Sequence, residues 1–482
     1  MDIQLTGTGG PGGWPEPGCG CAPCARARRA GVRRAPAAIV LDTAVRLPPA
    51  SQDPRLVAAA APGARDGYRI ARLPGGWDVT TLDGGRLLLA AGPGKVPEPA
   101  AGALPYHVAL LDLAGDPAQL GLLRRRGLVT DETVVAPVHI DHRVRSEREL
   151  GRRCAFWRVL VLEDGSGITV PPGRATRVTA PSGVSGSSPA SAPSPASAPS
   201  AATAPSAASA SAVRAVSKYS LTVPAAGEPW RVLILGGARS GKSAEAELRL
   251  AAEPEVTYVA TGPAPGADPE WAARVAAHRA RRPPWWRTAE TLDLAGKLRT
   301  ASGALLVDGL GTWLAGVMGE CGIWAALEAP ADNSADPGAA GRRLAERVSE
   351  LVEAWRDTRA HVVAISDEVG SGVVPATASG RRFRDELGRL NQLLAAESDD
   401  AALVVAGRVL ALSELPGKGA ARRGSRDVTR MEVIVSAAVR LLRFGPATID
   451  AVDSLPRVAG CGARPARPLS EGALEPVRFL WR

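Results

Sequence analysis

Aromatic side chains and long apolar runs are both scarce in this sequence of 482 residues. Phe, Trp and Tyr make up only 4% of the chain, although apolar residues of all kinds reach 45% and can build substantial cores. No run of about eighteen apolar residues occurs, so the sequence predicts no membrane-spanning helix. The first residues have neither a basic nor an apolar region, so we expect no signal peptide and a cytoplasmic protein.

Cysteine is also rare, with six residues in the whole chain. Cys19, Cys21 and Cys24 lie close together near the N-terminus, and the other three are far apart. Disulfide frameworks are typical of small secreted domains, in which cysteines are dense. The sequence therefore excludes a small disulfide-stapled fold.

Acidic residues are fewer than basic ones, which gives the chain a formal net charge of +9. A strongly basic protein can bind nucleic acid through its phosphates. Here the Arg residues are spread along the chain, and basic and aromatic residues do not alternate. We therefore favour an Arg-rich solvated surface, with an anionic substrate such as a nucleotide, over a nucleic-acid partner.

The chain is too long for one ordinary core and suggests two to three folded units. Residues 181–217 are almost wholly Ser, Ala and Pro and contain the direct repeat SPASAP. Such a segment cannot bury enough surface to offset its ordering entropy, so we interpret it as a disordered linker. The domains that we expect are 1–172, a linker at 173–228, 229–415, and a tail of uncertain order at 416–482.

The N-terminal unit has short apolar runs separated by Gly, Pro and Asp, a pattern typical of strands. These runs are residues 38–41, 86–90, 108–113, 133–138 and 158–162. Residues 116–126 could form a helix between two of them. We expect a smaller α/β or mainly β domain.

The second unit alternates between buried strands and amphipathic helices. The expected strands are residues 231–235, 256–260, 304–307, 361–366 and 402–406, and the helices are 242–252, 269–281, 339–358 and 381–397. This alternation implies right-handed crossovers and a largely parallel sheet covered on both faces. In the tail, residues 430–444 could form one helix.

A phosphate-binding loop follows the first of these strands. The sequence GGARSGKS at 236–243 fits G-x-x-x-x-G-K-[ST] and lies between a strand and a helix, the context that confirms the motif. We expect the backbone N–H groups and the helix N-terminus to hold the phosphates. Lys242 should reach the β- and γ-phosphates, and the Ser243 hydroxyl should ligate Mg²⁺.

Asp308 and His278 are the other candidates for chemistry. Asp308 ends a strand that we expect beside the P-loop strand, where its carboxylate could hold Mg²⁺ through water. His278 is surrounded in sequence by arginines, which should depress its pKa and favour a neutral imidazole able to attack phosphorus. From spacing alone, a solvated histidine on a basic helix is the simpler interpretation of His278. The Gly-rich turn at 368–375 follows another strand and is a weak signal for a ligand crevice.

Together these motifs resemble one family, the bifunctional adenosylcobinamide kinase/adenosylcobinamide-phosphate guanylyltransferases of cobalamin biosynthesis. The resemblance covers about residues 230–412. It rests on LILGGARSGKS at 233–243, YVAT at 258–261, RP at 282–283, WRTAE at 286–290, DEVGSGVVP at 367–375, FRD at 383–385, Gly388, Asn391 and VVAG at 404–407.

The resemblance implies two reactions and their cofactors, GTP, ATP and Mg²⁺. A nucleoside triphosphate phosphorylates the hydroxyl of adenosylcobinamide, and GTP then gives its GMP to that phosphate through a covalent histidine intermediate. The matching histidine is His278, which overturns the interpretation from spacing. The resemblance also implies a RecA-like fold and a homotrimer. The positions that it implies contact the nucleotide are Gly236, Gly237, Ala238, Arg239, Ser240, Gly241, Lys242, Ser243, Ala260, Thr261, Gly262, Arg279, Ala280, Arg281, Arg282, Glu290 and Asp308.

Three positions depart from the family's usual pattern. A second histidine often precedes the nucleophile, but Ala277 stands there. Arg281 replaces the Gly before Arg-Pro, and Asp367 replaces a common Asn. The segment at 329–341 is also rich in Pro and Ala. These departures leave the core chemistry in place.

The N-terminal unit resembles metallo-β-lactamase-fold phosphodiesterases. The resemblance rests on GTGGP at 7–11, PGCGCAPC at 17–24 and HIDH at 139–142. In these proteins such cysteines hold a structural zinc, and Cys19, Cys21 and Cys24 could reach one tetrahedral ion if a fourth ligand were present. The first metal-motif histidine is replaced by Pro137, so we expect a degenerate relic without hydrolase activity. Zinc ligation and free thiols both stay open for the cysteines.

Other functions compete with the leading one. A different P-loop small-molecule kinase would leave His278 incidental. An Arg-rich nucleic-acid-binding protein and an active N-terminal metallohydrolase are the remaining alternatives.

Overall fold

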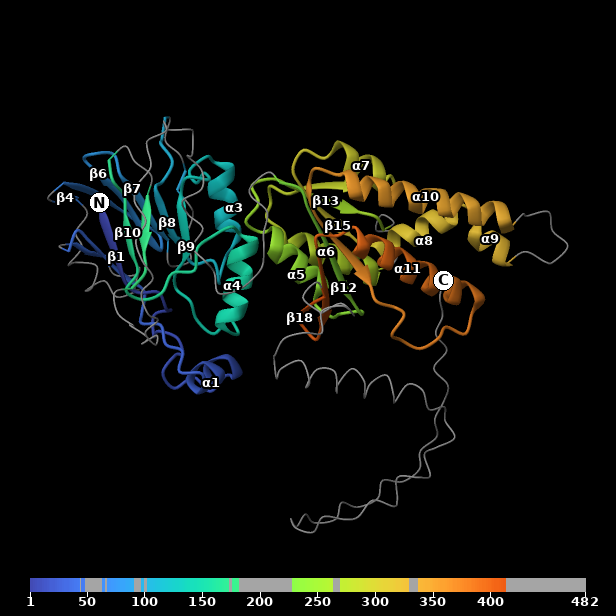
Figure 1. Ribbon diagram of the computed structural model, residues 1–482, viewed down its shortest axis with the longest axis horizontal. Coiled ribbons are helices and arrows are strands. Elements are labelled where there is room, and N and C mark those ends of the chain that lie inside the picture. The colour runs from blue at the N-terminus through green and yellow to red at the C-terminus, as the bar shows by residue number, and fades with distance from the viewer. Residues whose placement is uncertain are drawn as a thin grey trace, which may run out of the picture. The chain divides into compact units, whose positions relative to one another are not determined.

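The computed structural model describes residues 1–43, 45–47, 63–65, 67–90, 97–98, 102–172, 176–181, 228–262, 269–328 and 337–412. The described residues all fall within one compact unit, Met1–Leu415. Most of the expected linker at 173–228, the expected tail helix at 430–444 and most of the Pro/Ala-rich segment at 329–341 lie outside the described residues. Within the expected linker, however, residues 177–179 form a strand that pairs with the N-terminal region, so ordered structure continues past residue 172. Figure 1 labels the helices and strands.

The N-terminal region contains two sheets of strands that are mostly antiparallel. The first has the order β11(Arg177–Thr179), β10(Gly167–Thr169), β1(Asp2–Gly7), β2(Ala38–Leu41) and β3(Val45–Leu47). The second has the order β4(Gly63–Arg65), β5(Tyr68–Leu73), β6(Gly76–Thr81), β7(Arg86–Ala90), β8(Val108–Leu111) and β9(Val134–Pro137). The helices are α1(Ala22–Arg29), α3(Ala118–Arg125) and α4(Glu147–Phe156).

One core joins these two sheets. Alternate residues of β1 are buried, and Ile3 and Leu5 lie in the same apolar cluster as Trp77, Val79 and Leu110 of the second sheet. Period-two burial is what a sheet with one covered face requires. A β-rich N-terminal domain was expected, and the structure agrees.

The expected strand at 158–162 is wrong. Helix α4 ends at Phe156, and Arg158 takes a left-handed conformation with a φ of 54°. The apolar residues that follow belong to no strand. Val159 N donates a backbone hydrogen bond of 2.9 Å to Cys154 O, and Leu160 N donates one of 2.9 Å to Val135 O. Leu162 is buried and Val159, Leu160 and Val161 are half-buried, so an apolar run can pack against a core without being a strand.

The second region is built on a sheet with the order β14(Arg287–Glu290), β13(Val256–Ala260), β15(Ala304–Asp308), β16(His361–Asp367), β12(Trp230–Gly236), β17(Asp400–Val405) and β18(Arg408–Ala411). All neighbours pair in parallel except β17 and β18. The order β13-β15-β16-β12-β17 places one strand between the P-loop strand and the strand that ends in Asp308. The expected RecA-like fold with a mostly parallel sheet is confirmed.

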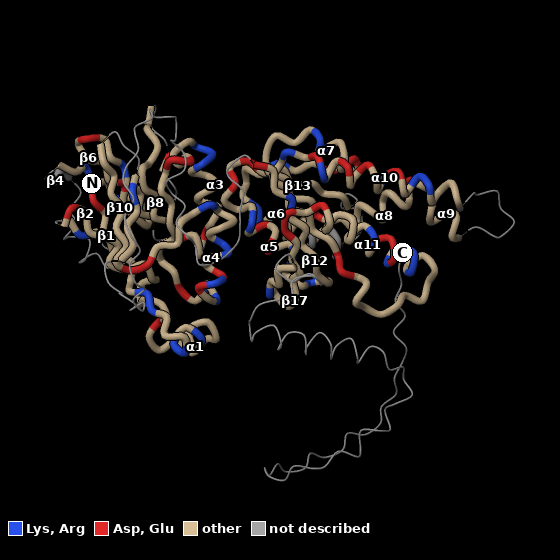
Figure 2. Tube along the Cα trace, viewed as in Figure 1, with Lys and Arg blue, Asp and Glu red and all other residues tan. Residues whose placement is uncertain are grey.

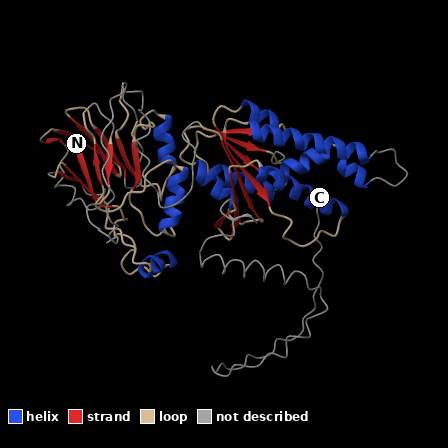
Figure 3. Ribbon diagram, in the orientation of Figure 1, coloured by secondary structure: helices blue, strands red, loops and turns tan. Residues whose placement is uncertain are grey.

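Helices cover both faces of this sheet, as Figure 3 shows. They are α5(Lys242–Leu250), α6(Pro269–Arg281), α7(Leu294–Thr300), α8(Leu310–Glu320), α9(Ile323–Glu328), α10(Pro337–Asp357) and α11(Ala378–Ala396). Val232 and Ile234 of β12 pack in one cluster with Leu250, whereas Leu233 packs in another with Trp313. Burial on both faces explains why these strands have continuous apolar sequences.

The carboxyl ends of the parallel strands meet at one edge. Gly236 pairs in register with Asp367, and Ala260 pairs with Asp308. In open α/β sheets ligands bind at this edge.

Charges are mixed along the described chain. Figure 2 shows Lys and Arg interspersed with Asp and Glu rather than gathered on one element. No helix in the described residues is both long enough and apolar enough to cross a bilayer.

Candidate nucleotide site

The P-loop connects the end of β12 to the first residue of α5. Gly241 has a φ of 99°, a conformation that glycine adopts without strain. A Cβ at Gly236 would lie 2.5 Å from Ser240 Oγ, so the turn needs glycine there for space. The N-terminal N–H groups of α5 have no partner within the helix and face the loop, which suits a phosphate.

The P-loop lysine already has an anionic partner. Lys242 Nζ lies 2.7 Å from Asp367 Oδ1 and donates a hydrogen bond of 3.1 Å to Gly237 O. The Lys242 side chain is 14% exposed and the Asp367 side chain 45% exposed. A bound triphosphate would have to replace Asp367 as the anionic partner of Lys242.

A pocket of about 820 Å³ opens beside the loop. Its volume suits a small-molecule ligand. The expected site residues that line it are Ala238, Arg239, Ser240, Gly241, Lys242, Ser243, Ala260, Gly262, His278, Arg279, Arg281, Arg282, Glu290 and Asp308. Gly236, Gly237, Thr261 and Ala280, which were also expected to contact the nucleotide, are not among the lining residues.

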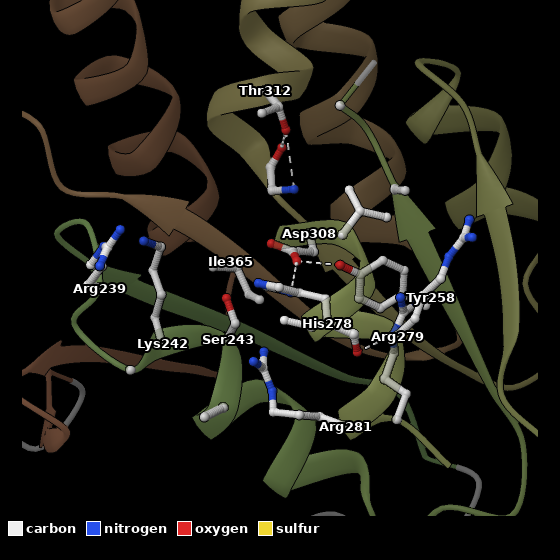
Figure 4. A pocket seen from close by; sticks show the side chains of 18 of the residues that line it. Arg239, Lys242, Ser243, Tyr258, His278, Arg279, Arg281, Asp308, Thr312 and Ile365 are labelled. Carbon is white, nitrogen blue, oxygen red and sulfur yellow. Dashed lines mark hydrogen bonds and ion pairs between the residues drawn. The ribbon is translucent and has the colours of Figure 1, made fainter. Parts of the chain in front are cut away.

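His278 lies at the centre of a small polar cluster, drawn in Figure 4. Its Nδ1 is 3.2 Å from Asp308 Oδ2, and the Tyr258 hydroxyl donates to the same carboxylate oxygen. Burial tends to raise the pKa of Asp308, but the hydrogen bonds from His278 and Tyr258 outweigh it and hold that pKa below its usual range. Burial and the Asp308 charge both raise the pKa of Tyr258, which keeps its proton.

The strand that carries Asp308 is held in place by two threonines. The Thr261 hydroxyl donates to Gly309 O at 2.6 Å, and the Thr312 hydroxyl donates to the same oxygen at 2.8 Å. The Asp308 carboxylate therefore projects from a fixed strand end.

The arginines near His278 bind other side chains. Arg281 forms two hydrogen bonds to Glu247, of 2.8 and 3.0 Å, which raise the pKa of the guanidinium. Arg282 lies over the Tyr258 ring at 3.6 Å, and Arg279 is 3.5 Å from Glu290. The setting expected for His278 was cationic. Arg279, Arg281 and Arg282 do line the same pocket, but the charged group nearest to the imidazole is the Asp308 carboxylate.

The strand that carries Asp308 also has a different position in the sheet from the one expected. We expected its strand to be beside the P-loop strand, but β16 lies between β15 and β12. The carboxylate on the strand next to the P-loop strand is Asp367. The order of strands along the chain does not reveal their order in the sheet.

Comparison with known proteins identifies the region that carries this pocket. Residues 232–412 match the family described as cobinamide kinase / cobinamide phosphate guanyltransferase. The bifunctional adenosylcobalamin biosynthesis protein CobU of Salmonella typhimurium is 38% identical over 181 residues, which are 36% of this chain and 96% of that protein. The chain belongs to this family.

Two further relatives agree. The bifunctional adenosylcobalamin biosynthesis protein CobP of Pseudomonas aeruginosa is 41% identical over 192 residues, 39% of this chain and 99% of that protein. The CobU of Escherichia coli is 34% identical over 183 residues, 36% of this chain and 96% of that protein. The resemblance found in the sequence is thus confirmed for the P-loop region, and these alignments span little more than a third of the chain.

Sequence reasoning missed several residues of this cobinamide kinase / guanyltransferase pocket. Tyr258 and Asp367 stood in matched strings, but neither was given a role, and Thr312 was not noticed. Glu247, which accepts hydrogen bonds from Arg281 but does not line the pocket, was also missed. Glu247 lies one turn and a half along the P-loop helix, a spacing that could have placed it near the loop. The turn at 368–375 does not line the pocket, and its Val373 is 93% exposed.

The cysteine cluster in the N-terminal region gains a fourth side chain. Ligand atoms of Cys19, Cys21, Cys24 and His142 all lie within 4.8 Å of one another, and Cys24 is buried. Cys19 Sγ is 3.8 Å from His142 Nδ1, and the same nitrogen is 3.4 Å from Glu16 Oε2.

The other residues of the HIDH string do not join His142. His139 Nδ1 is 3.2 Å from Asp112 Oδ2. Asp141 pairs with Arg143 at 2.8 Å. The Asp141 carboxylate is therefore paired with a guanidinium in this structure. The expected absence of hydrolase activity stays a prediction. The metallo-β-lactamase-like resemblance itself stays a prediction.

Proposed function

We propose that this chain catalyses two successive reactions of cobalamin biosynthesis. It phosphorylates adenosylcobinamide with ATP or GTP, and it then transfers GMP from GTP to adenosylcobinamide phosphate through a guanylyl group on His278. The observation that carries this proposal is that one pocket is lined by the P-loop and by a histidine. A bound triphosphate can then present its γ-phosphate for one reaction and its α-phosphate for the other.

In the kinase reaction the P-loop residues bind the triphosphate. The Lys242 ammonium stabilises charge on the transferred phosphoryl group, and the N-terminus of α5 adds its positive field. Ser243 and Asp308 both line the pocket with oxygen ligands of the kind that Mg²⁺ prefers. These two residues would hold the ion, which neutralises charge on the phosphates.

In the guanylyl reaction the imidazole of His278 attacks the α-phosphorus, and pyrophosphate leaves. Arg279, Arg281 and Arg282 line the same pocket and stabilise the negative charge of the transition state. The remaining expected contacts, including Glu290, bind the rest of the nucleotide.

The product assay tests both reactions together. Incubation of the chain with adenosylcobinamide, GTP and Mg²⁺ should give adenosylcobinamide-GDP and pyrophosphate, measured by liquid chromatography and mass spectrometry. His278→Ala should stop at adenosylcobinamide phosphate. If the wild-type chain also stops there, the alternative of a P-loop kinase without guanylylation is correct.

We also propose that Cys19, Cys21, Cys24 and His142 hold a structural zinc ion. Ligands around tetrahedral zinc are separated by roughly 3.6–3.8 Å, which is compatible with the distances in this cluster. Three thiolates and one imidazole are a donor set typical of structural zinc sites, so the zinc would tie α1 to the loop that contains His142.

The proposed domains are 1–172, 229–415 and a tail at 416–482, with a linker at 173–228. The family resemblance further suggests a homotrimer. Light scattering of the purified chain would give three times the mass of one chain, and a monomer would rule the trimer out.

A further inference from the structure

Two helices of the N-terminal region pack against the helix that follows the P-loop. The indole Nε1 of Trp157, at the C-terminal end of α4, donates a hydrogen bond of 2.9 Å to Leu248 O of α5. Arg124 of α3 donates one of 2.9 Å to Ala252 O, just beyond α5, and one of 2.7 Å to Trp157 O. The family match begins at residue 232, so α3 and α4 both lie outside it.

An apolar core continues across this contact. Leu123 of α3 is buried in the same cluster as Val232 of β12 and Leu250 of α5. Protein interiors are close-packed and resist deformation, so elements that share a buried core are held in a fixed relation. The N-terminal region and α5 therefore belong to one packed body.

Arg152 connects α4 to the first turn of α5. Its guanidinium donates two hydrogen bonds to the carboxylate of Glu245, which lies three residues after the P-loop lysine and has a side chain that is 7% exposed. Glu245 also accepts a hydrogen bond of 3.0 Å from Arg249, and the Arg249 guanidinium donates one of 2.7 Å to Asp400. A buried carboxylate that is bound from two sides fixes the helix end whose N–H groups bind phosphate.

Arg145 makes a contact still closer to the phosphate loop. Its Nη1 donates a hydrogen bond of 2.5 Å to Gly407 O, in the turn between β17 and β18. Gly407 N in turn donates one of 2.7 Å to Ser240 O, within the P-loop. The same turn lies against Gly241, where a Cβ would be 3.3 Å from Gly407 Cα. A single residue of the turn thus connects an arginine of the N-terminal region to the loop.

Both ends of this connection are held in place. The backbone N–H of Arg145 donates a hydrogen bond of 3.0 Å to Glu149 Oε2, and the neighbouring Val144 is buried. In the turn, Ala406 has a φ of 48°, a conformation that costs a non-glycine residue energy and that surrounding contacts must maintain. The hydrogen bonds of Gly407 to Arg145 and to Ser240 are two such contacts.

We propose that the N-terminal region is a structural part of the nucleotide site, and that Arg145 is the positioning residue through which it holds the P-loop. Arg145 acts through Gly407 on Ser240 and is not among the residues that line the pocket. This inference rests on nucleotide binding at the P-loop, which is one part of the proposed function, and is independent of guanylyl transfer. A loop that is already held in its binding geometry loses less conformational entropy when phosphate binds.

Binding of Mg-GTP to the full chain tests the role of Arg145. Arg145→Ala should weaken binding by about three- to tenfold, the size of effect produced by residues that are coupled to a site without touching its ligand. Arg145→Lys keeps a cation that can donate to Gly407 O and should bind within about twofold of wild type. Calorimetric titration well below the unfolding temperature of each variant measures the affinities, since a merely structural role would lower that temperature and leave the affinity unchanged.

Arg125→Ala is the matched control. Arg125 of α3 also contacts the P-loop region, through a hydrogen bond of 3.2 Å to Glu255 Oε1, but Glu255 precedes β13 and lies at the edge of the sheet opposite to the pocket. This variant should bind Mg-GTP like wild type. An equal loss of affinity in Arg125→Ala and Arg145→Ala would overturn the inference, because any loosening of the N-terminal region would then have the same effect.

Hydrogen exchange followed by mass spectrometry examines the loop in the nucleotide-free chain. Peptides that contain residues 236–243 and 404–409 should exchange faster in Arg145→Ala than in wild type, because amides exchange when local structure opens. Peptides from β13 should be unchanged. Equal exchange of the P-loop peptides in the two proteins would refute the role of Arg145.

The titrations also separate this inference from the proposed function. If wild type and Arg145→Ala bind Mg-GTP equally well, the nucleotide site does not depend on the N-terminal region and only this inference fails. If the wild-type chain binds no nucleotide, the proposed function fails and this inference fails with it.

Discussion

Lys242 Nζ and Asp367 Oδ1 lie 2.7 Å apart, so the lysine expected to bind phosphate forms an ion pair with a carboxylate of the protein itself. The pair joins the first residue of α5 to the last residue of β16. The family resemblance described in the sequence analysis would predict Asn at position 367, and Asn could not form this ion pair. It has consequences for nucleotide affinity.

Asp367→Asn should tighten GTP binding about 1.4- to 5-fold when Mg²⁺ is absent, since a partly exposed ion pair contributes about 0.2–1 kcal/mol. The substitution removes both the competitor for Lys242 and a negative charge near the phosphates. Calorimetric titration of the full chain measures the change. Glu353→Gln, an exposed acidic position on α10, is the control and should bind GTP like wild type. Equal or weaker binding by Asp367→Asn would show that the pair does not compete with nucleotide.

Lys242→Met should lower the rate of adenosylcobinamide phosphorylation by about 10²–10³-fold, a typical effect of removing one donor that stabilises transition-state charge. The initial rate of phosphate transfer from labelled ATP checks this. Lys297→Met changes an exposed lysine on α7 and should keep the wild-type rate. A Lys242→Met rate within about twofold of wild type would rule out the assigned role of the P-loop.

Gly241→Ala should destabilise the P-loop and weaken GTP binding, because φ is 99° there and a Cβ would lie 3.3 Å from Gly407 Cα. A left-handed conformation costs a non-glycine residue about 1–2 kcal/mol. Gly341→Ala is a matched control, since that glycine lies within α10 and a Cβ there meets nothing within 4 Å. It should gain roughly 0.5–1 kcal/mol in thermal unfolding. If both variants unfold like wild type, the strain at Gly241 is not real.

The zinc proposal is tested by metal content. The wild-type chain, purified without chelators, should contain about one zinc per chain by elemental analysis. Cys24→Ser and His142→Ala should lose most of it, because each removes one of the four ligands. Cys321→Ser alters a buried cysteine of the P-loop region and should retain the metal. A zinc content well below one in wild type would favour free thiols.

The P-loop region could be predicted well because its signals are local. Strand β13 and helix α6 have the residue ranges expected from the sequence, since buried parallel strands are continuous apolar runs. Edge strands gave no such signal. Strand β14 is mostly exposed and its sequence is mostly polar, so the search for apolar runs did not predict it.

The site residues also fall into two groups, those that a local motif predicts and those that only the fold brings together. The phosphate loop occupies consecutive residues and was found at once. The cluster of Tyr258, His278 and Asp308 joins three elements, and only the fold brings them together. His142 likewise reaches the cysteines from more than a hundred residues away, which no spacing rule would reveal.

The most direct test of the account is covalent labelling of the full chain by GTP. With GTP labelled in its α-phosphate, we predict an acid-labile, base-stable label on the protein that disappears in His278→Ala, whereas GTP labelled in its γ-phosphate should leave none there. Label that persists in His278→Ala, or no label from α-labelled GTP in the wild-type chain, would contradict guanylyl transfer through His278.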